Sequence, residues 1–182
     1  MSSGKTSRVY KGYRLAKRYK LGVSIIKPVM DTRYPENIVR THNGKIVRED
    51  VYLFGKDSFP KANKARMVMI DEAQFFSIDE IKSIVKKCEA ADTSFCTFFG
   101  LDRDYAGVLF PSSEYLLSYA HLKESLSAEC AVCGAEAHLT QRLFNGFPAP
   151  VGERILIGTL ANYEARCYSC YTHPRDVEEF FT

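Results

Sequence analysis

Short apolar runs alternate with helical periodicity along the first hundred residues of this 182-residue chain. Residues 23–27 form one such run and end at Pro28, a pattern typical of a strand buried in a parallel sheet. Residues 66–70 form the clearest run and lead directly into Asp71 and Glu72, and a third run covers residues 95–100. The pattern therefore predicts three buried strands in this part of the chain.

Two helices are predicted between these runs. Apolar residues at helical spacing favour a helix over residues 6–20 that ends before Gly22. Its apolar positions are Val9, Tyr13, Ala16 and Tyr19. Ser77 and Glu80 have the spacing of a capping box, which predicts a second helix from Ser77 to about Ala91. Residues 31–57 are polar and carry turn signals at Pro35, Asn43-Gly44 and Gly55, so we expect a mobile loop there.

The order of these elements predicts an α/β fold in which helices flank a parallel sheet. Ligands bind such sheets at the carboxyl ends of the strands, and Asp71-Glu72 and Leu101-Asp102 both follow strands there. From about residue 126 the sequence changes to short β-like runs, glycines and paired cysteines. We therefore expect a nucleotide-binding domain over residues 1–125, a small zinc-binding subdomain over residues 126–174 and a tail over residues 175–182.

Composition and charge narrow the possible partners. A chain with 46% apolar residues can bury a full core, and a net charge of +3 is too small to indicate nucleic-acid binding. The basic residues of the predicted helix 6–20 are interpreted as a solvated surface, with a nucleic-acid face as the alternative. No run approaches the roughly 20 apolar residues of a membrane span, and the N-terminus has no secretory pattern. We expect a cytosolic protein that contacts neither membrane nor nucleic acid.

The chain opens inside a phosphate-binding motif. In G-x-x-x-x-G-K-[ST], backbone N–H groups surround the phosphates, the lysine adds positive charge and the hydroxyl binds Mg²⁺. Gly4, Lys5 and Thr6 supply the second half of this motif, whereas its first glycine and the preceding strand would fall before Met1. The simplest explanation is a miscalled start codon or a trimmed fragment, so the first strand is expected to be missing.

Three acidic residues near this motif are candidates for the chemistry. Asp71 is suited to hold Mg²⁺ through water, and Glu72 to accept a proton, although an Asp-Glu pair could instead cap the following helix. Asp31 and Arg33 could tune Mg²⁺ and stabilise transferring charge, although by themselves they belong to an ordinary polar turn.

The cysteines indicate a structural metal. Cys130 and Cys133 form one C-x-x-C pair and Cys167 and Cys170 a second, and four thiolates at this spacing suit a closed tetrahedral Zn²⁺ site. A redox motif would be single, and disulfides would need an oxidising compartment. The other two cysteines, Cys88 and Cys96, are expected to be buried thiols. The four histidines have no ligand partners at a useful spacing.

Taken in order, nine motifs resemble the zinc-containing, type II thymidine kinases from Met1 to about Cys170. They are S-G-K-T-S, D-T-R-Y, I-D-E-A-Q-F-F, G-L-D, C-x-x-C, L-T-Q-R, I-G-T, N-Y and the second C-x-x-C. The resemblance implies that ATP phosphorylates the 5′-hydroxyl of thymidine or deoxyuridine, with Mg²⁺ and a structural Zn²⁺, in nucleotide salvage. It also implies a homotetramer in the cytoplasm and feedback inhibition by dTTP.

The resemblance implies a role for each matched position. Glu72 would be the general base. The phosphates and Mg²⁺ of ATP would be bound by Met1, Ser2, Ser3, Gly4, Lys5, Thr6, Ser7, Asp31, Arg33, Asp71 and Gln74. Thymidine would be bound by Phe75, Leu101, Tyr105, Phe110, Thr140, Arg154, Ile155, Leu156, Ile157, Gly158 and Tyr163. Of these, residues 154–158 and Tyr163 would read the base mainly with backbone groups, within a "lasso" between the cysteine pairs. Met1, Leu101 and Thr140 would surround the thymine methyl group.

The sequence departs from the family pattern at three places, and two other functions were considered. The opening glycine and first strand are absent, Tyr105 stands where phenylalanine is common, and Thr159 replaces the second glycine of I-G-G. One alternative is a truncated, inactive nucleoside-binding zinc module. Another is a DExx-box ATPase, since residues 71–74 have that form, although the chain has room for only one of the two lobes that a helicase needs.

Overall fold

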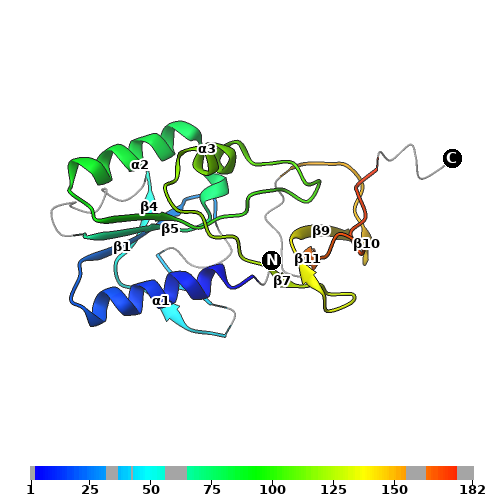
Figure 1. Ribbon diagram of the computed structural model, residues 1–182, viewed down its shortest axis with the longest axis horizontal. Helices are drawn as coiled ribbons and strands as arrows, with labels where there is room; N and C mark the ends of the chain where they lie inside the picture. Colours follow the sequence, from blue (N-terminus) through cyan, green and yellow to red (C-terminus); the bar gives the residue numbers. More distant parts are fainter. Residues whose placement is uncertain (1–2, 32–36, 42, 56–64, 155–162, 176–182) are drawn as a thin grey trace. The chain divides into compact units, whose positions relative to one another are not determined.

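The computed structural model describes residues 3–31, 37–41, 43–55, 65–154 and 163–175. They divide into two compact units (Figure 1). We call residues 5–101 and 111–119 the sheet unit, and residues 1–4, 102–110 and 120–182 the cysteine unit. The boundaries expected from the sequence, at residues 125 and 174, remain predictions.

The sheet unit is built on a four-stranded parallel sheet. Its strands are β1 (Val23–Pro28), β4 (Val51–Phe54), β5 (Met67–Ile70) and β6 (Phe95–Phe98), in the order β4-β1-β5-β6. Ile25 of β1 pairs with Val51 on one side and with Met69 on the other. All pairings are parallel, which confirms the predicted fold class.

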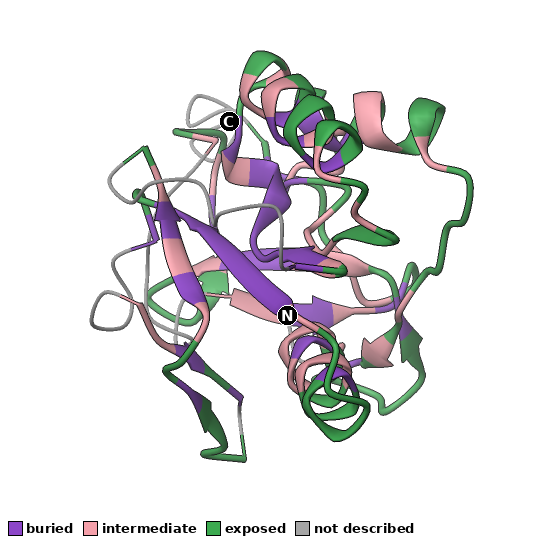
Figure 2. Ribbon diagram, turned by 90° about the vertical axis from the view of Figure 1, so that its left-hand side faces the viewer, coloured by how far each residue is buried: buried purple, intermediate pink, exposed green. Residues whose placement is uncertain are grey.

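Helices cover both faces of this sheet (Figure 1). On one face lies α1 (Lys5–Arg18), whose buried Val9 and Ala16 pack against Ile25 and Met69. The opposite face carries α2 (Ile78–Ala90) and α3 (Pro111–Tyr119), with the short 3-10 helix η2 (Ala73–Phe75) after β5. The core beneath α2 consists mainly of Ile26, Val68, Ile70, Ile81 and Ile84. Successive residues of one strand thus face opposite layers, and Figure 2 shows the central strands buried.

The helix ends were predicted with mixed success. The capping box is present, because the Ser77 side chain accepts from the Glu80 N–H and the Glu80 carboxylate accepts from the Ser77 N–H. Helix α1 ends before Gly22 as predicted, at Arg18, but Gly22 does not form its C-terminal turn. Lys20 adopts the left-handed conformation, with φ of 54°, and Leu21 N–H donates to the Ala16 carbonyl, so the chain turns before reaching Gly22.

Residues 31–57 contain more regular structure than the predicted loop. Strands β2 (Val39–Arg40) and β3 (Ile46–Val47) form a hairpin whose turn includes Gly44, with φ of 76°. Strand β4 belongs to the central sheet and was missed. Residues 51–54 form an apolar run as long as β5, but the run stands within a polar stretch with turn signals, so the whole stretch was interpreted as a loop.

Strand β6 is more exposed than predicted. Phe95 is 56% exposed, and Cys96 is exposed as well, contrary to the expected buried thiol, whereas Cys88 is buried as predicted. The reason is position: β6 pairs with β5 along one edge, and no other described strand pairs with its second edge. An apolar strand at the border of the described sheet has fewer neighbours to cover it.

The cysteine unit holds small antiparallel sheets. Strand β9 (Leu139–Phe144) pairs with β10 (Phe147–Pro148) and with β11 (Tyr163–Arg166), and β7 (Ala128–Glu129) pairs with β8 (Glu136–Ala137). Asn145 and Gly146, both with positive φ, close the β9–β10 hairpin. In the described part of the chain, no helix has the length and apolar character needed to cross a membrane.

Candidate active site and metal centre

The acidic pair that follows β5 lies at the carboxyl end of the sheet. Asp71 is 4% exposed, and its Oδ1 accepts a hydrogen bond of 3.0 Å from the Glu72 N–H. Burial, and secondarily the charge of Glu72, raise the pKa of Asp71 to about 6, while Lys5 and Lys27 oppose this shift. Burial makes the negative charge of this carboxylate unfavourable. A divalent cation bound beside it would favour the ionised form, so the group is suited to bind one.

Glu72 has a conformation that few residues adopt. Its φ of 53° and ψ of 47° lie in the left-handed region, which costs energy for a residue other than glycine and occurs often at functional sites. The Glu72 carboxylate accepts a 2.6 Å hydrogen bond from Gln74 Nε2. Lys5 Nζ lies 3.9 Å from the same oxygen, Oε2, so the lysine of the phosphate motif and this carboxylate are neighbours.

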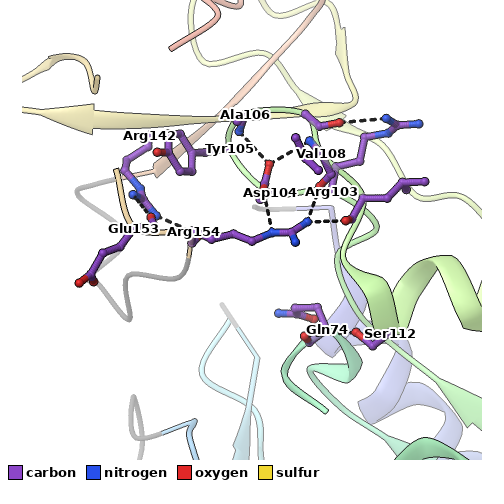
Figure 3. A network of polar contacts seen from close by, with 12 residues as sticks. Gln74, Arg103, Asp104, Tyr105, Ala106, Val108, Ser112, Arg142, Glu153 and Arg154 are labelled. Atoms are coloured by element: carbon purple, nitrogen blue, oxygen red, sulfur yellow. Dashed lines mark hydrogen bonds and ion pairs between the residues drawn. The ribbon is translucent and has the colours of Figure 1, made fainter. Parts of the chain in front are cut away.

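Gln74 determines how the Glu72 carboxylate is held. Its Oε1 accepts from the Leu101 N–H at 3.1 Å, which fixes the amide so that Nε2 points to Glu72. Ser112 Oγ donates to the Gln74 carbonyl (Figure 3). A Cβ on Gly100 would lie 3.0 Å from Gln74 Oε1 and 3.2 Å from Gln74 N, so a larger residue there would crowd Gln74. These contacts make Gln74 a positioning residue for Glu72, and the cofactor contact expected of it remains a prediction.

Asp31 is held by a lysine that sequence reasoning missed. Lys27 Nζ lies 3.1 Å from Asp31 Oδ2, and both side chains are 3% exposed. Lys27 also donates to the Ile38 carbonyl at 3.0 Å. The available signal was a lysine inside the apolar run 23–27, at a position where a buried strand seldom carries an unpaired charge. The two side chains thus form a buried ion pair just beyond the end of β1.

The phosphate motif lies at the start of α1. Gly4 has a φ of 81°, and α1 begins at Lys5, so Thr6 and Ser7 occupy its first turn. The N–H groups of a first turn have no partners inside the helix and attract anions. The sheet unit thus brings together Lys5, Asp71, Glu72 and Gln74 from the sequence prediction. Met1, Ser2, Arg33 and residues 155–158 lie outside the described residues.

A loop in the cysteine unit carries the predicted aromatic residues. Tyr105 and Phe110 are 4% and 5% exposed, and the Tyr105 hydroxyl accepts from Gly152 N–H at 2.8 Å and donates to the Gly152 carbonyl at 3.1 Å. Arg154 forms a 2.7 Å ion pair with Asp104 (Figure 3), and its guanidinium carbon lies 4.8 Å from the centroid of the Phe110 ring. Its Nη2 also donates to the carbonyls of residues 108 and 109. Tyr105, which stands where phenylalanine is common, thus adds two hydrogen bonds to the backbone of Gly152, one accepted and one donated.

Strands β9 and β11 carry two further predicted residues: Thr140 pairs with Ala165, and Tyr163 pairs with Arg142. Between Thr140 and Tyr163 in the sequence stand Gln141 and Arg142, to which the sequence analysis gave no role. Gln141 is fully buried, and it donates to the Thr172 carbonyl and accepts from the Thr172 N–H. The predicted binding roles of Phe75, Leu101, Thr140 and Tyr163 remain predictions.

The two cysteine pairs converge as predicted. The sulfur atoms of Cys130, Cys133, Cys167 and Cys170 all lie within 4.8 Å of one another, and those of Cys133 and Cys167 are 3.6 Å apart. A tetrahedral site with Zn–S bonds of about 2.3 Å places its sulfurs about 3.8 Å apart, so the cluster fits Zn²⁺.

Backbone hydrogen bonds favour the thiolate form of Cys130. Hydrogen bonds from backbone N–H groups, chiefly that of Cys167, lower the pKa of Cys130 to about 6. The neighbouring thiols, Cys133 first, raise the pKa of Cys170 to about 12. Gly134, with φ of 73°, donates to the Cys130 carbonyl and closes one of the two turns. A turn of this kind beside each pair is typical of a structural metal site.

Comparison with known proteins gives one consistent result. A family model described as thymidine kinase matches residues 1–171. The chain is 36% identical over 174 residues to the thymidine kinase of Chloroflexus aurantiacus strain J-10-fl, an alignment that covers 94% of this chain and 90% of that protein. The thymidine kinase of strain Y-400-fl matches with the same identity and coverage.

The cysteine cluster makes a direct prediction about metal content. We expect one zinc ion per chain in freshly purified protein, measured by atomic emission. Cys133→Ser should lose the ion and unfold at a lower temperature, because apparent binding energies of structural zinc sites are on the order of 10 kcal/mol. The control is Cys96→Ser, which removes an exposed thiol and should keep both zinc and melting temperature. Purified protein without zinc would refute the prediction.

Proposed function

Because this chain belongs to the thymidine kinase family, we propose that it transfers the γ-phosphoryl group of ATP to the 5′-hydroxyl of thymidine or deoxyuridine in nucleotide salvage. The observation that carries the proposal is the arrangement at the end of β5. An acid suited to a metal, a second acid held by an amide donor and the lysine of a phosphate motif meet there. Phosphoryl transfer requires positively charged groups placed at the phosphates and a residue that accepts the proton of the nucleophile, and this set of residues supplies both.

The proposed roles follow from the geometry of the sheet unit. Lys5 and the first turn of α1 bind the phosphates, and Asp71 and Asp31 hold Mg²⁺·ATP at the strand ends. Mg²⁺, when bound, neutralises charge on the phosphate oxygens. The nucleoside 5′-oxygen attacks the γ-phosphorus, the bond to the β,γ-bridging oxygen breaks, and its electron pair leaves with ADP. Glu72 takes the 5′-hydroxyl proton, and Gln74 keeps the Glu72 carboxylate oriented.

The cysteine unit supplies the proposed nucleoside site. Residues 154–158 and Tyr163 recognise the base, Tyr105 and Phe110 belong to the aromatic wall, and Zn²⁺ on the four cysteines anchors both ends of this segment. The Gly152–Arg154 stretch is already attached to residues 104–110 by the Tyr105 and Arg154 contacts. We extend the proposal to a homotetramer that acts in the cytoplasm and is inhibited by the end product dTTP.

A nucleoside panel tests the reaction and its specificity. With ATP and Mg²⁺, we expect the chain, with the phosphate motif completed at its N-terminus, to phosphorylate thymidine and deoxyuridine and to act poorly on purine deoxynucleosides. The reason is that a pocket lined by backbone groups and a small methyl recess excludes the larger purine ring. Product monophosphates are measured by chromatography without any nucleic acid present. Efficient phosphorylation of deoxyadenosine or deoxyguanosine would rule this specificity out, and nucleoside binding without turnover would indicate an inactive binding module.

Substitution of the proposed base separates chemistry from binding. Glu72→Gln preserves size and most hydrogen bonding but removes basicity, so kcat should fall roughly 10²- to 10⁴-fold while KM for thymidine stays nearly constant. Asp71→Asn should differ, weakening Mg²⁺·ATP binding and responding to added Mg²⁺.

Thermal melting is the control, because Glu72 has a strained backbone at a strand end. A Glu72→Gln protein of unchanged stability that retained more than about a tenth of the wild-type kcat would fall outside the range for a lost base. In that case Glu72 would not be the base.

A further inference from the structure

Arg142 is a buried arginine at the centre of the cysteine unit. It is 6% exposed and lies on β9 opposite Tyr163 of β11. Its guanidinium stacks over the Tyr105 ring, with 3.7 Å between the guanidinium carbon and the ring centroid (Figure 3). The head group is therefore fixed between a strand and the aromatic loop.

The donors of this guanidinium reach two stretches of chain that are separated in sequence. Nη1 donates to the Glu153 carbonyl at 2.5 Å, and Nη2 donates to the Arg154 carbonyl at 3.2 Å. Nε donates to the Tyr163 hydroxyl at 3.1 Å. One side chain thus joins residues 153–154 to residue 163, the described residues on either side of residues 155–162.

The partners of Arg142 are unusual for a buried cation. Within the described residues, its contacts are two carbonyls, a phenolic oxygen and aromatic rings, and no carboxylate lies within ion-pair distance. Glu153 is contacted through its backbone, and its carboxylate points away (Figure 3). Burying a charge without an opposite charge is costly, so strand packing alone would be served better by an apolar residue. The forked donors of arginine can hold two adjacent carbonyls and a hydroxyl simultaneously, which a lysine cannot do.

We propose that Arg142 is a positioning residue that sets the spacing between Glu153–Arg154 and Tyr163 and thereby determines thymidine affinity. The kinetic part rests on the proposed function, which includes Arg154 and Tyr163, both contacted by Arg142, among the residues that recognise the nucleoside. A positioning role of this kind acts before the chemical step. Its loss should therefore change the binding of thymidine without changing the rate of phosphoryl transfer or the binding of ATP.

Two variants and one matched control test the proposal. Arg142→Lys retains the positive charge but loses the forked set of guanidinium N–H donors, and Arg142→Met removes both the charge and the donors. The control is Arg103→Lys, an arginine in the same unit whose side chain is about half exposed and donates to the Gly107 carbonyl. For each protein, kcat and the KM values of thymidine and ATP are measured together with the melting temperature.

A second readout does not depend on activity. Trypsin cleaves after arginine, and the carbonyl of the bond that follows Arg154 is the one that Arg142 holds. Cleavage after Arg154, timed by mass spectrometry without ligands, should accelerate at least severalfold in both Arg142 variants and stay within about twofold of wild type in Arg103→Lys. In the kinetic assay, the thymidine KM of Arg142→Lys should rise about tenfold, because lysine cannot replace all the hydrogen bonds that the charged guanidinium donates.

The outcomes are distinguishable. Unchanged cleavage after Arg154 in both Arg142 variants would overturn the proposal, and so would an unchanged thymidine KM in an active enzyme. Parallel loss of kcat, both KM values and melting temperature would also overturn it, because it would indicate general destabilisation. Failure of wild-type protein to phosphorylate thymidine would refute the proposed function instead, and the trypsin measurement would still decide whether Arg142 holds the two stretches together.

Discussion

The side-chain amide of Gln74 is the interaction on which the proposed chemistry depends. It connects the carboxylate after β5 with the backbone after β6, because it donates to Glu72 and accepts from the Leu101 N–H. Ser113 Oγ donates to the Leu101 carbonyl, so α3 secures the same point. The left-handed backbone of Glu72 and the close approach of Gly100 to Gln74 accompany this connection. The parallel sheet makes it possible by ending β5 and β6 at the same edge.

Local signals in the sequence were sufficient to predict much of this arrangement. The apolar run before Asp71-Glu72, the capping box at Ser77 and the two C-x-x-C pairs each lie within a few residues, and all appear as expected. Their positions also implied the α/β class, since strands and helices alternate. Features that depend only on residues close together in the sequence can therefore be predicted from the sequence alone.

The features that were missed depend on contacts between distant residues. The apolar residues of β4 stand within a polar stretch, and their place in the central sheet is defined by pairing with β1; the exposure of β6 follows from its place in the strand order. Lys27 and Arg142 were overlooked because each is defined by its partners: Asp31 and the Ile38 carbonyl for one, and residues 153, 154 and 163 for the other. Sequence periodicity contains no information about such partners.

The most direct test of the account is the pH dependence of the single-turnover rate of phosphoryl transfer to thymidine in Gln74→Met. Methionine retains the volume of glutamine but cannot donate to Glu72. A hydrogen bond to a carboxylate stabilises its charged form, so losing the bond should raise the pKa of the base and shift the acidic limb of the rate profile to higher pH. The maximal rate should also fall about tenfold or more, within the range for an impaired base. A folded Gln74→Met protein with the wild-type profile and rate would contradict the account.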